Sequence, residues 1–592
     1  MKKSYPFSNL HRRSLIKAAL SAGAGMATLP KTIFAANDTK EILDQDYDVV
    51  VVGSGAAGMT AALRASKRGL KTLVVEKSKL YGGSTARSGG GIWIRNNTIN
   101  QEAGIKDSQE EALAYLNLVA GTGSSFEKQK AYIQQGPEMI SFVMENSPLK
   151  FRTMEGYPDY YPELYGGKAE GASIEPEEFD GRALGKELKN LNPAYIKTPE
   201  GVVVYGGDYK WMTLASVSIR GAARAATAIS RYLAAKIRGR KPLTMGQALA
   251  GGLRAGLLKA DVPVLLGASI SDLSADRDGR INGLFVETKD GLRLVKASKG
   301  VIMASGGFEK NLKMRQQYQK APVDTSWTLG AETNTGDGIR IGEAVGADLK
   351  LMDDAWWGPT IPLTKESPYF CLSERSLPGS IIVNSKAKRF VNESSPYHDV
   401  VNAMYEQPKQ GDELPIWMIA DQRYRNRYLL RDVPALLPLP KEWYESGAVV
   451  KADSLAELAE KIGLATEDLI DTVSTFNNYA ENGVDEDYQR GESAYDQYYA
   501  DPNVKPNVSL YPIENGPYFA FRMVPGDLGT KGGLETDEHS RVLRPNGSVI
   551  EGLYAAGNVS APVMGRSYAG AGSTLGPAMA FGYIAADHIA DS

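Results

Sequence analysis

A strand–turn–helix–strand pattern near the start of the chain constrains the fold more than any other feature. The segment "DYDVVVVGSGAAGMTAALRASKRGLKTLVVEK" (46–77) begins with a short apolar run, as a buried parallel strand does. Gly53, Gly55 and Gly58 follow in the pattern G-x-G-x-x-G, and after a helical stretch a second strand ends at Glu76. Such glycines permit a tight turn, a close approach to a pyrophosphate and close helix–strand packing, while the acid accepts hydrogen bonds from a ribose. The pattern therefore predicts a dinucleotide site in an α/β fold.

A second glycine-rich segment follows this unit directly and distinguishes between the dinucleotides. It reads "LYGGSTARSGGGIWI" (80–94), and its glycines offer repeated backbone donors beside the same phosphates and a flavin. We therefore predict FAD as the cofactor. The residues expected to contact FAD in this part of the chain are Gly53, Ser54, Gly55, Ala56, Ala57, Gly58, Glu76, Lys77, Gly83, Ser84, Thr85, Ser88, Gly89, Gly90 and Gly91.

Three later segments have the same glycine-rich character, namely "GVIMASGGFEKN" (300–311), "NTGDGIRIGEAVGADL" (334–349) and "GLYAAGNVS" (552–560). Together with 80–94 they resemble the flavoprotein family that includes the fumarate reductase and succinate dehydrogenase flavoprotein subunits. The resemblance covers about residues 44–592. It implies further FAD contacts at Gly306, position 337, Gly557, Asn558, Ser573, Thr574 and Leu575.

The order of these segments implies a cofactor domain that is split in sequence. The expected fold class is α/β, with a Rossmann-like FAD-binding domain formed by residues 44–355 and 525–592. An α+β substrate-capping domain is expected as an insertion at 356–524, where amphipathic helical patterns occur in 455–491. Ligand sites are frequent between domains, so the substrate is expected where the two domains meet.

Two departures from the dicarboxylate reductases of this family concern the substrate. In those enzymes a proton-donating arginine follows a segment like "KRFVNE", whereas "AKRFVNESSPYHDV" (387–400) has Tyr397 at that place, four positions after Glu393. The segment "DLGTKGG" (527–533) likewise replaces their His-Thr-x-Gly-Gly element. The site is therefore expected to take an uncharged substrate rather than fumarate or succinate.

Five separated segments are similar to another branch, the 3-ketosteroid Δ1-dehydrogenases. The resemblance implies that the Tyr568 hydroxyl and the Gly572 N–H hold the C3 ketone of a steroid. It also implies that Tyr397 removes a proton from C2 while flavin N5 takes hydride from C1. The segments are "GYPDYYPE" (156–163), "ERSLPG" (374–379), "NESSPY" (392–397), "MVPGDLGTKGGL" (523–534) and "SYAGAGSTLGPAMAFGY" (567–583).

The resemblance also implies a second tyrosine that assists Tyr397. Help is needed because an unperturbed tyrosine has a pKa of about 10 and is mostly protonated near neutral pH. Tyr160 is our choice for this role, with Tyr157, Tyr161 and Tyr165 as competitors. Taken singly, any of these tyrosines reads as a packing residue with one hydrogen bond, so only the family segments give them roles.

The composition argues against several other classes of protein. The chain has one cysteine, Cys371, and four histidines, none spaced from another like a pair of metal ligands, so no metal site is expected. A formal net charge of -3 gives no basic footprint for a nucleic-acid partner. The partners that the family resemblance implies are a steroid substrate and an electron acceptor, and the sequence does not identify that acceptor.

The N-terminus carries a targeting pattern. Arg12 and Arg13 precede a weakly apolar run of about a dozen residues, which is too short to span a bilayer. Residues 1–36 resemble a bacterial twin-arginine signal, which predicts an exported protein, periplasmic or extracellular. The alternative is a disordered basic tail on a cytoplasmic protein.

A basic run, "KIRGRKPL" (236–243), follows an apolar-spaced helical pattern. It reads either as a solvated junction between two helices or as a contact with a membrane surface, where a sterol-like substrate partitions.

Two other functions stay open. One is a different oxidoreductase of the family, either a 3-ketosteroid Δ4-dehydrogenase or an enone or fumarate-type reductase. The other is an exported flavin protein that only transfers electrons and turns over no steroid.

Overall fold

The computed structural model describes residues 42–195, 202–364, 367–411 and 414–592. Within it, Gln45–Ser592 form one compact unit. The expected signal segment, residues 1–36, lies outside the described residues.

The first sheet contains the predicted dinucleotide-binding unit at its centre. Its strands run in the order β20-β21-β11-β1-β2-β8. The strands from β21 to β8 are parallel to one another, whereas β20 pairs with β21 in the antiparallel direction. The strands β9 and β10 extend the first part of β11 as an antiparallel ribbon. The bounds are β1 (Tyr47–Val52), β2 (Thr72–Glu76), β8 (Val264–Leu266), β9 (Ser269–Ala275), β10 (Ile281–Thr288), β11 (Gly291–Met303), β20 (Arg541–Leu543) and β21 (Val549–Ala555).

This sheet draws strands from both ends of the described chain, which confirms a split Rossmann-like domain in an α/β fold. Val50 of β1 pairs with Leu73 of β2 on one side and with Val301 of β11 on the other. All three side chains are fully buried, as expected for a parallel sheet that is covered on both faces.

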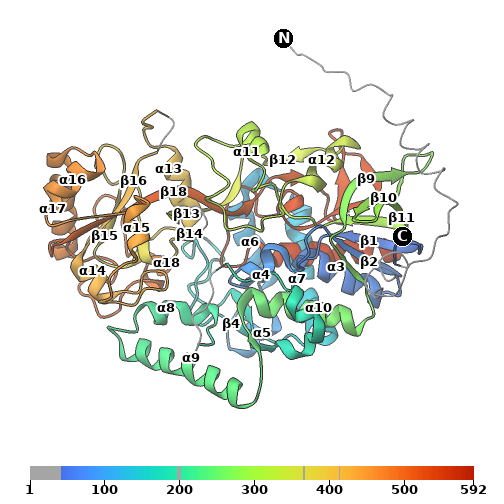
Figure 1. Ribbon diagram of the computed structural model, residues 1–592, viewed down its shortest axis with the longest axis horizontal. Coiled ribbons are helices and arrows are strands. Elements are labelled where there is room, and N and C mark those ends of the chain that lie inside the picture. Colours follow the sequence, from blue (N-terminus) through green and yellow to red (C-terminus); the bar gives the residue numbers. More distant parts are fainter. Residues whose placement is uncertain (1–41, 196–201, 365–366, 412–413) are drawn as a thin grey trace, which may run out of the picture. The chain divides into compact units, whose positions relative to one another are not determined.

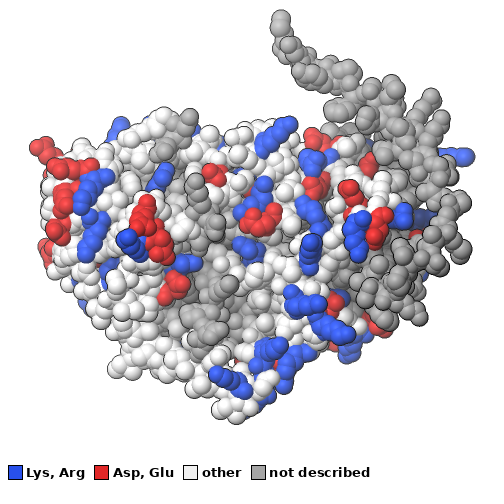
Figure 2. All heavy atoms as spheres, in the orientation of Figure 1, with Lys and Arg blue, Asp and Glu red and all other residues white. Residues whose placement is uncertain are grey.

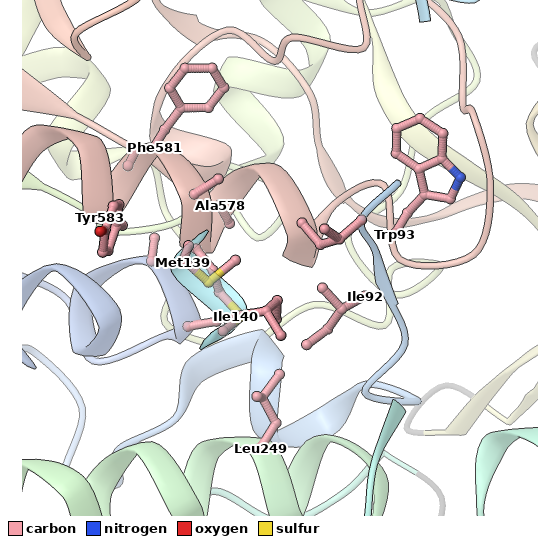
Figure 3. Packing of buried hydrophobic residues seen from close by; sticks show 14 of the residues in the cluster. Ile92, Trp93, Met139, Ile140, Leu249, Ala578, Phe581 and Tyr583 are labelled. Carbon is pink, nitrogen blue, oxygen red and sulfur yellow. The ribbon is translucent and has the colours of Figure 1, made fainter. Parts of the chain in front are cut away.

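Four helices build the main core beside this sheet. They are α3 (Ala56–Lys67), α7 (Phe126–Asn146), α10 (Met245–Lys259) and α19 (Leu575–Asp591), and α3 packs on both α10 and α19. Figure 3 shows Ala578 of α19, Met139 and Ile140 of α7 and Leu249 of α10 directed into the same space. The C-terminal helix is thus anchored against the first helix of the dinucleotide-binding unit.

A second, antiparallel sheet is formed by residues 355–530 (Figure 1). Its order is β14-β13-β18-β16-β15, and β17 also pairs with β18. The bounds are β13 (Ala355–Thr364), β14 (Ser367–Phe370), β15 (Ser380–Val383), β16 (Ile416–Asp421), β17 (Val449–Ala452) and β18 (Tyr518–Thr530). The long strand β18 crosses residues 524 and 525, between which one domain boundary was expected. The expected domain boundaries stay predictions.

The remaining elements connect or cover these two sheets. The helices are α4 (Gly83–Arg87), α5 (Thr98–Glu102), α6 (Gln109–Ala120), α8 (Tyr209–Thr213), α9 (Ile219–Ile237), α11 (Leu312–Tyr318), α12 (Asp337–Ala344), α13 (Tyr397–Tyr405), α14 (Gln422–Arg427), α15 (Lys441–Glu445), α16 (Leu455–Ile462), α17 (Thr466–Asn482) and α18 (Ala494–Tyr498). The short strands are β3 (Ile92–Trp93), β4 (Phe151–Thr153), β5 (Ser173–Pro176), β6 (Phe179–Asp180), β7 (Pro242–Leu243), β12 (Leu349–Lys350) and β19 (Gly533–Leu534). None of the described helices has the length and apolar character needed to cross a bilayer.

Candidate active site

One large cavity, of about 940 Å³, runs from the glycine-rich turn after β1 to the second sheet. Most of the residues expected to hold FAD line it, as do the four residues expected to act on the substrate. The predicted residues in its wall are Gly53, Ser54, Gly55, Ala56, Ala57, Glu76, Lys77, Gly83, Ser84, Thr85, Ser88, Gly89, Gly90, Gly91, Tyr160, Gly306, Tyr397, Gly557, Asn558, Tyr568, Gly572, Thr574 and Leu575.

Two of the expected FAD contacts are outside this wall. A Cβ atom on Gly58 would overlap the carbonyl oxygen of Gly53, so Gly58 serves the close packing of α3 on the turn. Ser573 is fully buried, and its hydroxyl donates to the Gly570 carbonyl at 2.8 Å. Both residues shape the cavity from behind it.

The turn after β1 is braced by Glu76. Its Oε2 accepts hydrogen bonds from the Ser54 N–H (2.9 Å) and hydroxyl (2.7 Å), while its Oε1 accepts from the Ser78 N–H (2.8 Å). Gly53 has φ +107°, and a Cβ atom there would overlap the Ala304 carbonyl, so only glycine fits. Glu76 therefore fixes the turn as well as facing the cavity.

The glycine contact with FAD that was expected at position 337 is wrong in residue type. Position 337 is an aspartate, and the glycines are its neighbours Gly336 and Gly338. Asp337 does line the cavity, but with a side chain, and Lys77 Nζ donates to its Oδ2 at 2.5 Å. Burial opposes ionisation here, yet the bonds and charge from Lys77 lower the pKa of Asp337. Lys77 and Asp337 together form a polar wall beside Glu76.

The cavity fits FAD by the nature of its lining. The N-terminal residues of two helices, α3 (Ala56, Ala57) and α19 (Leu575), face it, and such termini favour anionic groups. Glycine backbone forms much of the surface between them. When bound, FAD would be held by these backbone groups, with Glu76 at the ribose.

Three tyrosines meet at the far end of the cavity. The ring centroids of Tyr160, Tyr397 and Tyr568 are 5.2–5.3 Å apart in every pair. The Tyr160 hydroxyl donates to the Tyr397 hydroxyl at 2.9 Å, and the Tyr568 hydroxyl lies 3.0 Å from Thr574 Oγ1. Although each ring is buried within the protein, all three residues line the cavity and can meet a ligand there.

Of the competing tyrosines, none has its hydroxyl on Tyr397. Tyr157 accepts from Tyr499 at 3.1 Å, and Tyr161 donates to the Asp399 carboxylate at 3.0 Å. Tyr165 is 71% exposed. The geometry therefore favours Tyr160 as the neighbour that assists Tyr397.

Burial raises the pKa of all three clustered tyrosines. The pKa of Tyr397 is well above its usual value of 10.0, because burial outweighs the hydrogen bond from Tyr160 that favours the phenolate. The pKa values of Tyr160 and Tyr568 are also raised by burial. A protonated Tyr568 is what a hydrogen-bond donor requires, whereas Tyr397 needs alkaline pH or proton transfer to act as a base.

Gly572 lies where the substrate end meets the glycine-rich wall. It has φ +96°, and a Cβ atom on it would overlap the Gly91 carbonyl group, so the two backbones are in close contact. Among the described residues, no partner accepts a hydrogen bond from the Gly572 N–H. This N–H is therefore available to a ligand that also meets Tyr568.

Asp159 ties the tyrosine loop to the glycine-rich segments. Its buried carboxylate accepts from Trp93 Nε1 (2.8 Å) and the Lys168 N–H (3.0 Å), and Arg95 Nη1 lies 3.3 Å away. Asp159 also bridges to Gly570, and the Tyr160 N–H donates to the Ala569 carbonyl at 3.0 Å. Burial raises the pKa of Asp159 to about 6 despite Arg95. Tyr160 and the loop before Gly572 are thus held as one piece.

The segment before Tyr397 is held by buried ions. Glu393 accepts from Arg389 Nε (2.9 Å) and Arg490 Nη1 (3.1 Å), and Arg389 also binds Asp485 at 2.7 Å. Four residues later, Tyr397 begins α13 directly after Pro396. This network fixes where α13 begins and therefore where the Tyr397 ring lies.

We expect the variant Arg490→Met to lower the free energy of unfolding by about 3–5 kcal/mol, because removing one partner leaves buried charge unbalanced. Urea denaturation of the FAD-loaded protein measures the loss. The matched control is Lys441→Met, which breaks the exposed Lys441–Glu445 pair and is expected to cost under about 1 kcal/mol. Equal losses in the two variants would contradict a structural role for the Arg490 network.

Several aromatic residues of the site were not predicted from the sequence. Phe370 stacks edge-on against Tyr397, with centroids 5.0 Å apart, and Trp356 does so against Tyr568, also at 5.0 Å. Trp356 Nε1 donates to Asn558 at 3.1 Å. Tyr499 lines the cavity behind Tyr157. Their only sequence signal is the large number of tyrosines, 30 in the chain, which follow no regular period.

Comparison with known proteins places this site in a family. Residues 48–575 match the family model described as "FAD binding domain". A 3-oxosteroid 1-dehydrogenase of Mycolicibacterium smegmatis is 52% identical over 556 residues, which cover 92% of this chain and 97% of that protein. The chain belongs to the 3-oxosteroid 1-dehydrogenase family.

Other members of the 3-oxosteroid 1-dehydrogenase family agree with this assignment. The 3-oxosteroid 1-dehydrogenase of Mycobacterium tuberculosis strain H37Rv is 52% identical over 557 residues, 92% of this chain and 99% of that protein. A crystal structure of the 3-ketosteroid Δ1-dehydrogenase from Sterolibacterium denitrificans with 1,4-androstadiene-3,17-dione has a TM-score of 0.87 and 40% identity, covering 92% of this chain and 99% of that one. The family indicated by the five sequence segments, the α/β fold and FAD as cofactor are confirmed.

Proposed function

We propose that this protein is an FAD-dependent dehydrogenase that introduces a C1–C2 double bond into 3-ketosteroids. The observation that carries the proposal is the set of Tyr397, Tyr568 and Gly572 around one end of a cavity whose other end fits FAD. The named activities of the 3-oxosteroid 1-dehydrogenase relatives agree with it.

The residues suggest how the chain acts on the substrate. The Tyr568 hydroxyl and the Gly572 N–H donate to the C3 ketone, so negative charge that flows to this oxygen is stabilised when the C2 proton leaves. Tyr397 accepts that proton as its phenolate and becomes a neutral phenol, and Tyr160, whose hydroxyl donates to it at 2.9 Å, stabilises the phenolate before the transfer. When bound, FAD supplies the oxidising chemistry by accepting the hydride from C1.

The experiment that tests the proposal is anaerobic mixing of the FAD-loaded enzyme with androst-4-ene-3,17-dione. We expect the visible absorbance of the flavin to bleach. One molecule of androsta-1,4-diene-3,17-dione should form for each flavin that is reduced. Flavin that stays oxidised would refute the steroid function. Oxidation of reduced flavin by fumarate would instead support a reductase, and bleaching that yields a different double bond would support a Δ4-dehydrogenase.

The reduction of flavin by substrate is expected to be faster at higher pH. Burial raises the pKa of Tyr397, so its basic form is scarce at neutral pH and increases about tenfold for each pH unit below that pKa. Stopped-flow rates at limiting substrate should therefore rise from about pH 7 to about pH 10 with a slope near one on a logarithmic plot. A flat profile would contradict Tyr397 as the base.

We also propose that the chain is exported with FAD bound. The support is the Arg12–Arg13 pattern, which belongs to a pathway for folded proteins. Fractionation of cells is the test, with an Arg12→Lys, Arg13→Lys double variant as the comparison. Uncleaved wild-type protein confined to the cytoplasm would refute export. Whichever compartment fractionation identifies, the electron acceptor is expected in the same compartment as the enzyme.

A further inference from the structure

The helix α9 has its apolar side on the outside. Ile219, Ile229, Leu233 and Ile237 are 93%, 47%, 51% and 86% exposed. At 3.6 residues per turn they fall on one face of the helix. The exposed Ala222 and Ala226 fall on the same face. A surface helix normally turns its apolar face toward the core. In α9 this face points away from the protein instead.

The side of α9 toward the protein explains this reversal. Gly221, Ala228 and Ala235 are the buried residues of the helix, and they are small. The arginines beside them pair with acids of the protein, Arg224 with Glu155 at 2.6 Å and Arg231 with Asp208. Polar contacts therefore hold α9 in place, and the described chain covers only about half of Ile229 and Leu233 and little of Ile219 and Ile237.

The charge around this face is positive. Lys236, Arg238 and Lys241 lie at the C-terminal end of α9, and within the described part of the chain none of them forms an ion pair. Figure 1 places α9 at the lower edge of the view, and Figure 2 shows Lys and Arg gathered over the right-hand end of that edge. An apolar stripe with cations at one end complements an anionic lipid surface.

The helix is also continuous with the cavity. The segment before it contributes Val204, Tyr209 and Met212 to the cavity wall, and the segment after it contributes Leu243 and Met245. The last residue of α8, Thr213, accepts a hydrogen bond through its carbonyl from the N–H of Leu429 at 3.4 Å, and Leu429 lines the cavity too. The segments on both sides of α9 therefore connect it to the cavity wall, which would bring a surface that covers α9 close to the site.

We propose that the outer face of α9 docks the enzyme on the surface of an anionic phospholipid bilayer. The helix has 19 residues and would lie in the interface plane, with its apolar face among the upper acyl chains. A bilayer is the occupant we infer because α9 carries exposed apolar side chains, contains no acidic residue and adjoins cations. Docking would bring the site close to an apolar substrate dissolved in the membrane, and this advantage rests on the proposed function. The docking itself does not depend on that function.

The test is co-sedimentation of the FAD-loaded full chain with vesicles of phosphatidylcholine that contain about one third phosphatidylglycerol. We expect the wild-type protein to bind and the double variant I219E/I237E to need at least ten times more lipid for the same bound fraction. The matched control is L292E/L294E, which changes two exposed leucines on β11 (42% and 45% exposed) and should bind like wild type. All three proteins keep residues 1–36, so the signal segment contributes equally to each.

A second variant tests the charge. K236Q/R238Q should bind vesicles with phosphatidylglycerol less well and should not differ from wild type on pure phosphatidylcholine. The proposal is overturned if the wild type does not bind, or if I219E/I237E and L292E/L294E lose binding alike. It is also overturned if sedimentation velocity without lipid shows a wild-type dimer that I219E/I237E converts to monomer, because a second copy would then cover the face. Each of these readouts is independent of steroid turnover.

Discussion

Replacing Tyr397 with phenylalanine is expected to lower the rate of flavin reduction by substrate about 10²–10⁴-fold, the usual loss when a general base is removed. Phenylalanine keeps the ring that packs against Tyr160, Tyr568 and Phe370, and removes only the hydroxyl. The cost should therefore fall on the chemical step and leave FAD binding unchanged. Anaerobic stopped-flow measurement at saturating steroid gives the rate of the chemical step, and the flavin absorbance of the purified variant shows whether FAD is still bound.

The matched control is Tyr165→Phe, which makes the same change in a neighbouring tyrosine that is 71% exposed. We expect wild-type rates from it. If Tyr397→Phe kept most of its activity while Tyr160→Phe lost it, the base would be Tyr160. The hydrogen bond between the two hydroxyls would then carry the proton in the opposite direction.

Removing the Tyr568 hydroxyl is the second change for which we expect a large loss of kcat. A single donor to a developing oxyanion is worth about 10²–10³ in kcat, or about 3–4 kcal/mol. The raised pKa of Tyr568, caused by burial, keeps it protonated and able to donate across the working pH range. Tyr568→Phe should therefore lower kcat strongly with a smaller change in KM, because the charge on the ketone oxygen develops only in the transition state.

Binding of the product measures the ground state separately. We expect Tyr568→Phe to bind androsta-1,4-diene-3,17-dione within about tenfold of the wild-type affinity, since one neutral hydrogen bond contributes about 0.5–1.5 kcal/mol. Thr574→Val, which removes the neighbouring hydroxyl at 3.0 Å, is the control for a change in local packing. If Tyr568→Phe retained full kcat/KM, the Gly572 N–H would have to hold the ketone without Tyr568.

The dinucleotide-binding unit was predictable because its spacing encodes geometry. The spacing of Gly53, Gly55 and Gly58 describes a turn at the end of a strand, and the structure has that turn between β1 and α3. The three tyrosines proposed to act on the substrate were predictable only through a resemblance to a family. They come from segments far apart in the chain, and no local pattern brings residues 160, 397 and 568 together.

Other parts of the site could not be read from the chain. Trp356 and Phe370 lie on β13 and β14, where alternation assigns a side chain to one face of the sheet. It does not say that Phe370 lines the cavity or that Trp356 packs against Tyr568. Asp159 looked like any acid of a turn, although it is buried and joins three segments. For α9, the pattern showed an amphipathic helix, but periodicity does not say which face the protein covers.

The contact between Gly572 and Gly91 has a consequence for how such enzymes diversify. Because these two backbones touch, the glycine-rich segment expected to contact FAD also positions the Gly572 N–H, the donor proposed for the ketone. In the proposed mechanism, Tyr397 reaches the substrate from another part of the chain, at the start of a helix anchored by Arg389 and Arg490. Under that mechanism, the residue that handles the proton can be replaced without moving the backbone contact between Gly572 and Gly91.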